Sequence, residues 1–524
     1  MLFGTLLQLA ISHQKKEVLE LGLDEKINNA FMPFATWWED FILSELPVLG
    51  AGIPIVLILL IAAAFFFTVH FDFVNIKYFP LAVQVVRGAY DNLEKLGADK
   101  AGGEDMAQDH SGEVNHFQAL TTAVSGTVGL GNIAMVAVAI SIGGPGATFW
   151  MIVAGFLGMS SKFVECTLGV KYRDIDTDGS VFGGPMYYLS RGFKQRGHGT
   201  LGKIIAAIFA ILCVGASLGG GNAFQTNQAA AQIISRFNIE SPSSGTVIGV
   251  LFAILVGIVI IGGIKRIAMV TEKIVPFMAA LYVAAALFII FLNTAIVGEA
   301  FERILSEAFS PRATVTGGFV GVMVQGFRRA AFSNEAGAGS AAIAHSAVKT
   351  KYPASEGLVG LLEPFIDTVV ICTLTALVIV IFNINGGFAY GDVVNQQVLL
   401  PNGTRVGGVN LTSLAFENTI PGSSYLLVLA VVLFAFSTII SWSYYGLQAW
   451  KYLFGRAKFS DLLYKVLFLG FTVLGAAITL DAVIKFSDAM ILALVFPNIL
   501  GLLFLYPEAK AELVKYIKLI KGNA

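Results

Sequence analysis

Long apolar stretches dominate this chain, and short polar segments separate them. The stretch 48–70 contains no Asp, Glu, Lys or Arg, and a bilayer core of about 30 Å needs roughly 20 apolar residues per helix. The further apolar stretches are 117–142, 147–170, 201–234, 246–263, 267–292, 316–347, 357–382, 424–454, 462–480 and 482–506. The pattern predicts an all-α integral membrane protein with about eleven transmembrane helices.

The distribution of Lys and Arg predicts how these helices are oriented. Cytoplasmic loops of membrane proteins carry an excess of both residues. With the N-terminus outside, the inner segments are 71–115, 171–203, 263–273, 346–356, 451–465 and 507–524. They hold 23 of the 34 Lys and Arg residues, whereas the outer segments hold 8. We therefore expect an outer N-terminus and a cytoplasmic C-terminus.

The spans divide into one leading helix and two blocks of five. The predicted parts are an outer-face segment 1–47, an extra helix 48–70, a cytoplasmic linker 71–115, a first repeat 116–292, a second repeat 313–506 and a cytoplasmic tail 507–524. An odd number of spans per block makes the second block inverted relative to the first. The first 47 residues lack the features of a cleavable signal, and Trp37 and Trp38 suggest an interfacial helix there.

Composition and charge narrow the function classes. Only 13% of the residues are charged, against about a quarter in soluble proteins, which excludes a nucleic-acid-binding domain and an ordinary cytosolic enzyme. The net charge of −1 implies no global electrostatic partner. Cys166, Cys213 and Cys372 lie in apolar runs and are expected to be core residues without a disulfide or a metal.

Two segments at membrane depth, 121–132 and 327–340, place glycines and polar side chains in the middle of a predicted helix. Each glycine costs about 1 kcal/mol there relative to alanine. Val128-Gly-Leu-Gly-Asn-Ile-Ala134 aligns with Ala336-Gly-Ala-Gly-Ser-Ala-Ala342, each in the first span of its block. Close helix packing is the alternative, but it does not explain Asn132, Ser333, Asn334 and Glu335. Paired broken helices in inverted repeats indicate a transporter binding site.

The chemistry of such breaks suggests what they bind. Unwound carbonyls suit a small cation such as Na⁺, and free N–H groups suit a carboxylate, so an amino acid fits both. A third polar cluster places Phe434, Ser437 and Thr438 on one helical face, with Trp442 one turn further on. This cluster suits Na⁺, although the hydroxyl groups could instead bond to the carbonyls of their own helix.

At these residues the chain resembles the alanine or glycine:cation symporter family, the sodium:alanine symporters. The most specific stretch is Gly143-Gly-Pro-Gly-Ala-Thr-Phe-Trp-Met-Ile-Val-Ala-Gly-Phe-Leu-Gly-Met-Ser160, followed by 327–340 and 437–446. The resemblance runs from about Phe117 to Phe454, and Met151-Ile152 departs from the more usual Met-Trp. The family is similar in architecture to the bacterial leucine transporter, with five-plus-five inverted repeats.

The resemblance also implies a set of site residues. The substrate-binding set is Thr127, Gly129, Leu130, Gly131, Phe332, Ser333, Asn334 and Trp442. Main-chain N–H groups of the glycine segment would hold the substrate carboxylate, and Phe332 and Trp442 would keep the pocket small. The Na⁺ site would contain Ser125, Val128, Phe434, Ser437 and Thr438. Asn132, with Thr127 and Ser333, lies where some relatives place a second Na⁺.

Several ionisable residues fall within the spans and are functional candidates. Lys162 and Glu165 are three residues apart and are expected to form a structural pair, whereas Glu335, Glu363 and Asp367 stay unassigned. The hypothesis is Na⁺-coupled import of alanine or glycine by alternating access, by a monomer in the cell membrane, without a cofactor or nucleic acid. The alternative is H⁺-coupled symport of another small amino acid. No pair of histidines has the spacing of metal ligands, which argues against an enzyme. Channels favour filters built by oligomers, whereas two internal repeats supply the whole predicted site here.

Overall fold

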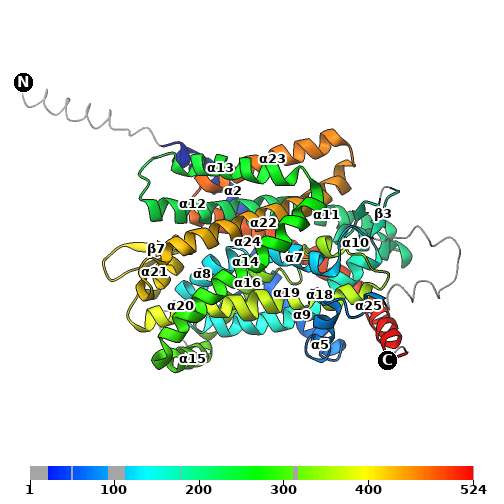
Figure 1. Ribbon diagram of the computed structural model, residues 1–524, viewed down its shortest axis with the longest axis horizontal. Helices are drawn as coiled ribbons and strands as arrows, with labels where there is room; N and C mark the ends of the chain where they lie inside the picture. Colours follow the sequence, from blue (N-terminus) through cyan, green and yellow to red (C-terminus); the bar gives the residue numbers. More distant parts are fainter. Residues whose placement is uncertain (1–21, 49–50, 93–111, 178, 311–316, 523–524) are drawn as a thin grey trace, which may run out of the picture.

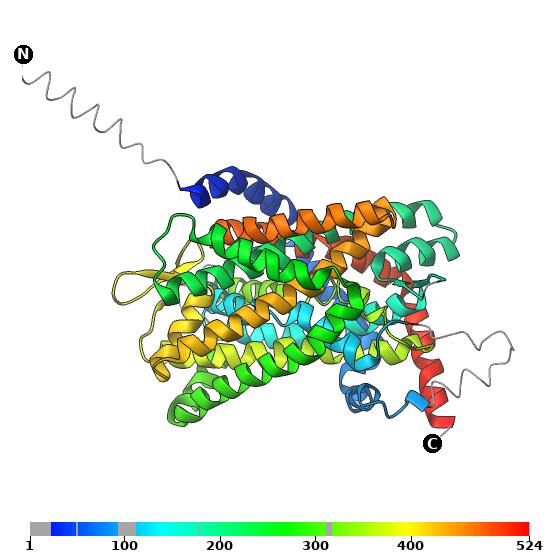
Figure 2. The ribbon, with the colours of Figure 1, turned by 45° about the horizontal axis from the view of Figure 1, so that its top comes forward.

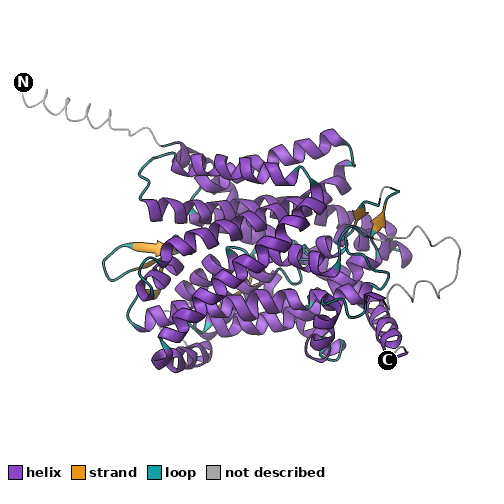
Figure 3. Ribbon diagram, in the orientation of Figure 1, coloured by secondary structure: helices purple, strands orange, loops and turns teal. Residues whose placement is uncertain are grey.

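The computed structural model describes residues 22–48, 51–92, 112–177, 179–310 and 317–522. Helices form almost all of it, and the strands are confined to short hairpins at the ends of the helices (Figure 3). The parts of the predicted outer segment before residue 22 and of the linker at 93–111 lie outside the described residues. The prediction of the all-α fold class is confirmed.

The first half of the chain begins with helices that pack on the outside of the bundle. They are α2 (Leu23–Ile42), α3 (Ile55–His70), α4 (Val74–Lys77) and α5 (Phe79–Val86). The next helices are α7 (His116–Thr127), α8 (Val136–Gly143), α9 (Ala147–Lys171), α10 (Pro185–Gln195), α11 (Gly199–Leu218), α12 (Phe224–Phe237), α13 (Ser244–Ile260), α14 (Gly263–Leu292) and α15 (Thr294–Phe309). The helix α2 packs against α24 and leaves Trp37 and Phe41 60% and 62% exposed. Its place at the membrane interface stays a prediction.

The second half contains a further series of helices. They are α16 (Gly318–Asn334), α17 (Ala342–His345), α18 (Pro353–Gly360), α19 (Leu362–Pro364), α20 (Thr373–Ile384), α21 (Val409–Thr419), α22 (Ser423–Phe454), α23 (Lys458–Ala477), α24 (Leu480–Ala493) and α25 (Val495–Gly522). The helices α13 and α23 lie side by side at one edge (Figures 1 and 2), and α22 runs next to α7, α11, α12 and α14. Segments from both halves therefore share one core.

The strands form three small antiparallel sheets. They are β1 (Glu45–Val48) with β2 (Ala51–Pro54), β3 (Asp174–Ile175) with β4 (Val181–Phe182), and β5 (Ala389–Val394) with β6 (Gln397–Leu399) and β7 (Arg405–Gly407). Leu46 lies opposite Ile53, and Val398 lies opposite Val406. These hairpins connect helices and leave the helical core unbroken by sheet.

In the described part of the chain, 7 helices are long and apolar enough to cross a membrane, or 8 if one bent pair counts as a span. The bent pair is His116–Thr127 with Gly131–Gly143, at 48°. The helices α3 and α13 are shorter apolar helices. The chain is a multi-pass membrane protein by these features, while eleven spans and the inverted-repeat layout stay predictions.

Both expected breaks are present, and π-helical segments add two more. The first break separates α7 from the π-helical segment Gly131–Met135, and the second separates α16 from α17. The predicted spans 201–234 and 357–382 are interrupted at Gly219–Ala223 and Phe365–Cys372. The run Gly219-Gly-Gly221 is the sequence signal for the former, because consecutive glycines weaken an α-helix.

Candidate functional site

At the first break, main-chain N–H groups in the middle of the molecule have no helical carbonyl as their acceptor. The last residue of α7 is Thr127, and the N–H groups of Gly129 and Leu130 no longer point along a helix to a carbonyl. The N–H of Gly129 donates to Asn132 Oδ1 at 2.9 Å, and the N–H of Leu130 donates to Gln225 Oε1 at 2.9 Å. Two predicted carboxylate-binding groups are thus bonded to side-chain amide oxygens.

Gln225 is a site residue that the sequence reasoning missed. It lies on α12 directly after the π-helical segment, and its Nε2 donates to the Gly220 carbonyl at 2.9 Å. This second bond fixes the amide so that its oxygen faces Leu130. The polar run Gln225-Thr-Asn-Gln228 inside a predicted span was the available signal, since polar residues at membrane depth mark functional positions.

The predicted Na⁺ residues form an oxygen-rich contact between α7 and α22. Thr438 Oγ1 donates to the Ser125 carbonyl at 2.9 Å, and Ser125 Oγ donates to the Ser437 carbonyl at 2.7 Å. Ser437 Oγ donates to the carbonyl of Phe434 in its own helix at 3.0 Å. Ser437 therefore does bond back to its helix, whereas Thr438 bonds across to the first break. Val128, which follows the end of α7, is fully buried.

Trp442 connects the two breaks. Its indole Nε1 donates to the Gly126 carbonyl at 3.2 Å in the first break and to Glu335 Oε1 at 3.1 Å in the second. Glu335 has a left-handed φ of 55°, and Gly337 and Gly339 follow with φ of 92° and 85°. Glu335 also accepts a hydrogen bond from Ser340. The second break is therefore held open by side-chain bonds in place of helical ones.

Asp367 contacts both breaks from the π-helical segment Phe365–Cys372. Its Oδ1 accepts from Asn132 Nδ2 at 2.6 Å, and its Oδ2 accepts from Ser333 Oγ at 2.8 Å and Thr368 Oγ1 at 2.6 Å. The structure thus brings together Asn132 and Ser333, two of the residues expected near a second ion. The Thr127 hydroxyl instead bonds to the Ala123 and Val124 carbonyls of α7, at 3.3 and 3.4 Å.

Aromatic side chains leave little room around the first break. A Cβ on Gly131 would lie 3.5 Å from Ser333 Cα and 3.6 Å from Phe332 Cδ1. Phe332 packs edge-on against Phe224, with ring centroids 5.2 Å apart, and a Cβ on Gly221 would meet the Trp442 ring. The side chain of Asn334 donates to Thr368 at 2.8 Å and so faces the π-helical segment Phe365–Cys372. Phe332 and Trp442 therefore pack directly beside the two glycine-containing segments.

The expected pair of Lys162 and Glu165 is wrong. Lys162 Nζ pairs with Glu363 Oε1 at 3.2 Å, and Glu165 Oε1 accepts from the Gly337 N–H at 2.8 Å and Asn498 Nδ2 at 2.9 Å. In the folded chain, Glu165 lies beside a main-chain donor of the second break. Lys162 lies within ion-pair distance of Glu363 in α19. Sequence spacing alone could not show these partners.

The Lys162–Glu363 pair extends into a buried chain of ionisable groups. Glu363 Oε2 lies 3.5 Å from His345 Nε2, and His345 Nδ1 lies 2.5 Å from Glu356 Oε1. Glu356 Oε2 lies 2.5 Å from His116 Nδ1 at the start of α7. The chain links α9, α19, α17, α18 and α7, and buried charges of this kind need such partners. It fixes the two broken helices relative to their neighbours.

Comparisons with known proteins identify the family of this chain. A model of the sodium:alanine symporter family matches residues 40–523. The chain is 36% identical over 472 residues to the sodium/alanine symporter AgcS of Methanococcus maripaludis, covering 90% of this chain and 96% of that protein. It is 34% identical over 390 residues to the amino-acid carrier protein AlsT of Bacillus subtilis, covering 74% and 73%.

A solved structure shows the same fold at low sequence identity. The manganese transporter of Eremococcus coleocola superposes with a TM-score of 0.51 at 14% identity, covering 77% of this chain and 80% of that one. This likeness concerns the fold alone. The match along nearly the whole sequence confirms the resemblance to the family. The chain belongs to the sodium:alanine symporter family.

Proposed function

We propose that this protein is a Na⁺-coupled symporter that carries alanine and glycine into the cell by alternating access. The observation that carries the proposal is the bond from Thr438 to the Ser125 carbonyl. It joins an oxygen cluster to the same break that exposes the N–H groups of Gly129 and Leu130. One break therefore offers acceptors for a cation beside donors for a carboxylate, which supports binding of an ion and a zwitterion together.

The cation would bind among oxygen atoms of two helices. Ser125 and Phe434 supply carbonyls, and Ser437 and Thr438 supply hydroxyl groups that each have two acceptor lone pairs. The Val128 carbonyl at the end of α7 completes the proposed set. All five residues are buried, so that a bound ion loses its water and depends on these oxygens. A cation here would hold α7 against α22.

The substrate carboxylate would take the place of the two amide oxygens now bonded to the first break. Charge-assisted hydrogen bonds are about twice as strong as neutral ones, so a carboxylate competes well against Asn132 and Gln225 for the N–H groups of Gly129 and Leu130. Phe332 and Trp442 would limit the substrate side chain, because Phe332 lies within contact distance of Gly131 and Trp442 packs directly against Gly221. These contacts support alanine and glycine over larger amino acids.

Movement between the two access states would centre on the broken helices. Trp442 contacts both breaks at once. The proposed working unit is a monomer. The alternative is coupling to H⁺, which requires Glu335 or Asp367 to titrate during the transport cycle. The gradient experiment below separates the two ions.

The test is uptake of labelled alanine into proteoliposomes under three imposed gradients. An inward Na⁺ gradient should drive accumulation, excess unlabelled glycine should suppress it, and inward K⁺ of the same concentration should not support it. Accumulation driven by a pH gradient without Na⁺ would contradict the Na⁺ site. The thermal unfolding transition shows whether the protein is folded. If folded protein takes up no alanine under any gradient, the substrate assignment is contradicted.

A further inference from the structure

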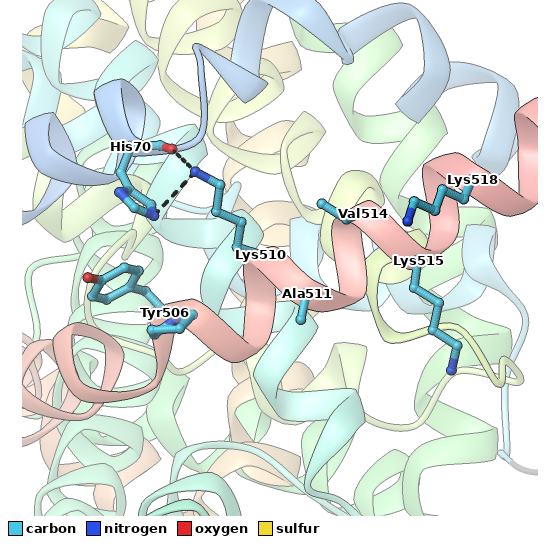
Figure 4. A pocket seen from close by; sticks show the side chains of 8 residues that line it. His70, Tyr506, Lys510, Ala511, Val514, Lys515 and Lys518 are labelled. Carbon is cyan, nitrogen blue, oxygen red and sulfur yellow. Dashed lines mark hydrogen bonds between the residues drawn. The ribbon is translucent and has the colours of Figure 1, made fainter.

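A groove with three lysines on its borders lies where two apolar helices end. It has a volume of about 730 Å³, and its lining includes His70 and Tyr506 at one end and Lys510, Val514, Lys515 and Lys518 along α25 (Figure 4). A neighbouring pocket of about 200 Å³ shares Lys510 and Lys518 and adds Lys77 and Lys521. The groove is remote from the broken helices and has no part in the proposed transport site.

The groove coincides with the boundary between the apolar and the charged part of the molecule. The helix α3 contains no Asp, Glu, Lys or Arg before its end at His70, and α25 contains none from Val495 to Tyr506. The rings of His70 and Tyr506 are in contact, with centroids 4.6 Å apart. Beyond Pro507 the same helix carries all of its charges. Tyrosines favour the membrane–water interface, so this end of the bundle lies at the membrane surface.

The charges of α25 are sorted onto separate faces of the helix. Glu508 and Glu512 bond to Lys171, each at 2.9 Å, and Ala509, Leu513 and Tyr516 are buried against the bundle. The remaining face carries Lys510, Val514, Lys518 and Lys521, spaced three or four residues apart. Residues with this spacing lie above one another on a helix. The positive charges are thereby concentrated on the groove.

These lysines lack acidic partners within the described part of the chain. Lys510 Nζ donates to the His70 carbonyl at 2.9 Å (Figure 4), and Lys515 Nζ lies 5.8 Å from the centre of the Tyr352 ring. Neither contact neutralises an ammonium charge. Asp72, which lines the neighbouring pocket, is the carboxylate nearest in the sequence to the end of α3. The groove has excess positive charge, and its apolar residue Val514 is 47% exposed. Such a site is suited to an anion that also has apolar parts.

We propose that this groove, lined by Lys510, Lys515 and Lys518, binds the headgroup of an anionic phospholipid, with its phosphate on the face of Lys510 and Lys518 and its acyl chains against α3 and the apolar part of α25. Basic clusters directly beyond a transmembrane helix attract anionic lipids, and basic pockets between helices bind their headgroups. A free phosphate would satisfy the lysines alone. A phospholipid also covers Val514 and Tyr506 and lies with its chains in the layer that α3 and α25 already occupy.

The test measures lipid retained by the full-length protein in detergent. Delipidated protein is titrated with phosphatidylglycerol and with phosphatidylcholine of the same acyl chains, and bound lipid is counted by native mass spectrometry. We expect a preference of about tenfold for phosphatidylglycerol. The Lys510→Gln/Lys515→Gln/Lys518→Gln variant should lose it. Since Lys510 also bonds to His70, Lys515→Gln/Lys518→Gln provides a second variant that keeps this bond and should lose most of the preference.

The matched control is Lys203→Gln/Lys265→Gln/Lys458→Gln, which removes the same charge from exposed positions on other segments and should keep the preference. Equal binding of the two lipids, or an unchanged preference in both groove variants, would overturn the proposal. A rise in the unfolding temperature with inorganic phosphate alone, lost in the groove variants, would also overturn it and assign the groove to a soluble anion. None of these readouts depends on alanine or Na⁺ transport.

Discussion

The hydroxyl of Thr438 donates a hydrogen bond to the main-chain carbonyl of Ser125, 2.9 Å away and 313 residues earlier in the sequence. Neither residue is remarkable for its type, since both are small and polar. Their contact exists because α7 stops at Thr127 and α22 passes beside that end. The proposed ion site lies where these two helices meet. A small change at either residue should therefore alter ion binding.

We expect Thr438→Ala to weaken Na⁺ binding with little effect on folding. The change removes one proposed ligand and one buried hydrogen bond, worth about 1 kcal/mol, and the apparent affinity for Na⁺ should fall by roughly tenfold. The measurement is alanine uptake as a function of Na⁺ concentration. Thr438→Ser keeps the hydroxyl and should behave like the natural protein. An unchanged Na⁺ dependence in the alanine variant would remove Thr438 from the site.

Gly129→Ala should abolish transport while the protein remains folded. A Cβ at this position would meet Thr438 Oγ1 and would lie 3.0 Å from Gln225 Oε1, so it would push apart the oxygen cluster and the amide that faces Leu130. Gly470→Ala is the matched control, because a Cβ on this helical glycine of α23 meets nothing within 4 Å. Uptake and the thermal unfolding transition are measured for both. Normal uptake by Gly129→Ala would show that the break is less tightly packed than described.

Gln225→Leu should strengthen alanine binding more than Na⁺ binding. It removes the amide oxygen that competes with the substrate carboxylate for the Leu130 N–H, and a buried N–H without an acceptor, which costs about 1 to 3 kcal/mol, then remains only in the empty site. Alanine binding measured by calorimetry at saturating Na⁺ should tighten by about tenfold. Gln225→Glu keeps an acceptor at this length and adds a negative charge beside the substrate carboxylate, so it should bind alanine more weakly than the leucine variant; the reverse order would count against the assigned contact.

Lys162→Met should destabilise the protein strongly. It leaves Glu363, fully buried, without its ammonium partner, and removing one partner of a buried ion pair costs about 3 to 5 kcal/mol. Unfolding by sodium dodecyl sulfate in mixed micelles measures the loss. Adding Glu363→Gln to Lys162→Met removes the orphaned charge and should restore part of the stability. A double variant less stable than the single one would show that His345 and Glu356 depend on Glu363.

Glu417 should make the stability of the protein pH-dependent on the acid side. Hydrogen bonds from the main-chain N–H groups of Gly422, at 2.8 Å, and Ser424, at 2.9 Å, hold the pKa of this carboxyl below its usual value of 4.5. A lowered pKa in the folded state stabilises it above the usual pKa, and this contribution is lost as the pH falls through the folded value.

The Glu417→Gln variant tests this directly. Its unfolding temperature should lie below that of the natural protein at neutral pH, and the difference should shrink as the pH falls below about 4.5. The control is Glu302→Gln on the exposed face of α15. A difference that is constant across the acid range would show that the carboxylate does not stabilise the start of α22.

Much of the site was accessible from the sequence because breaking a membrane helix requires unusual residues. The glycines at 129, 131, 337 and 339, and the polar residues next to them, have no place in an ordinary apolar span, so the pattern located both breaks. The spacing of Phe434, Ser437 and Thr438 likewise placed three oxygens on one face of a helix. These features are local and follow from helix geometry.

The partners of those residues were decided only by the tertiary structure. The long apolar spans, the two breaks and the family are determined by the sequence itself, because hydropathy and glycine content act within one segment. That Gln225 faces Leu130, that Asp367 holds Asn132 and Ser333, and that Lys162 pairs with Glu363 and not with Glu165 depends on how helices far apart in the chain pack. Buried polar groups take whichever partner the packing brings within hydrogen-bonding distance, and spacing along the chain carries no information about that.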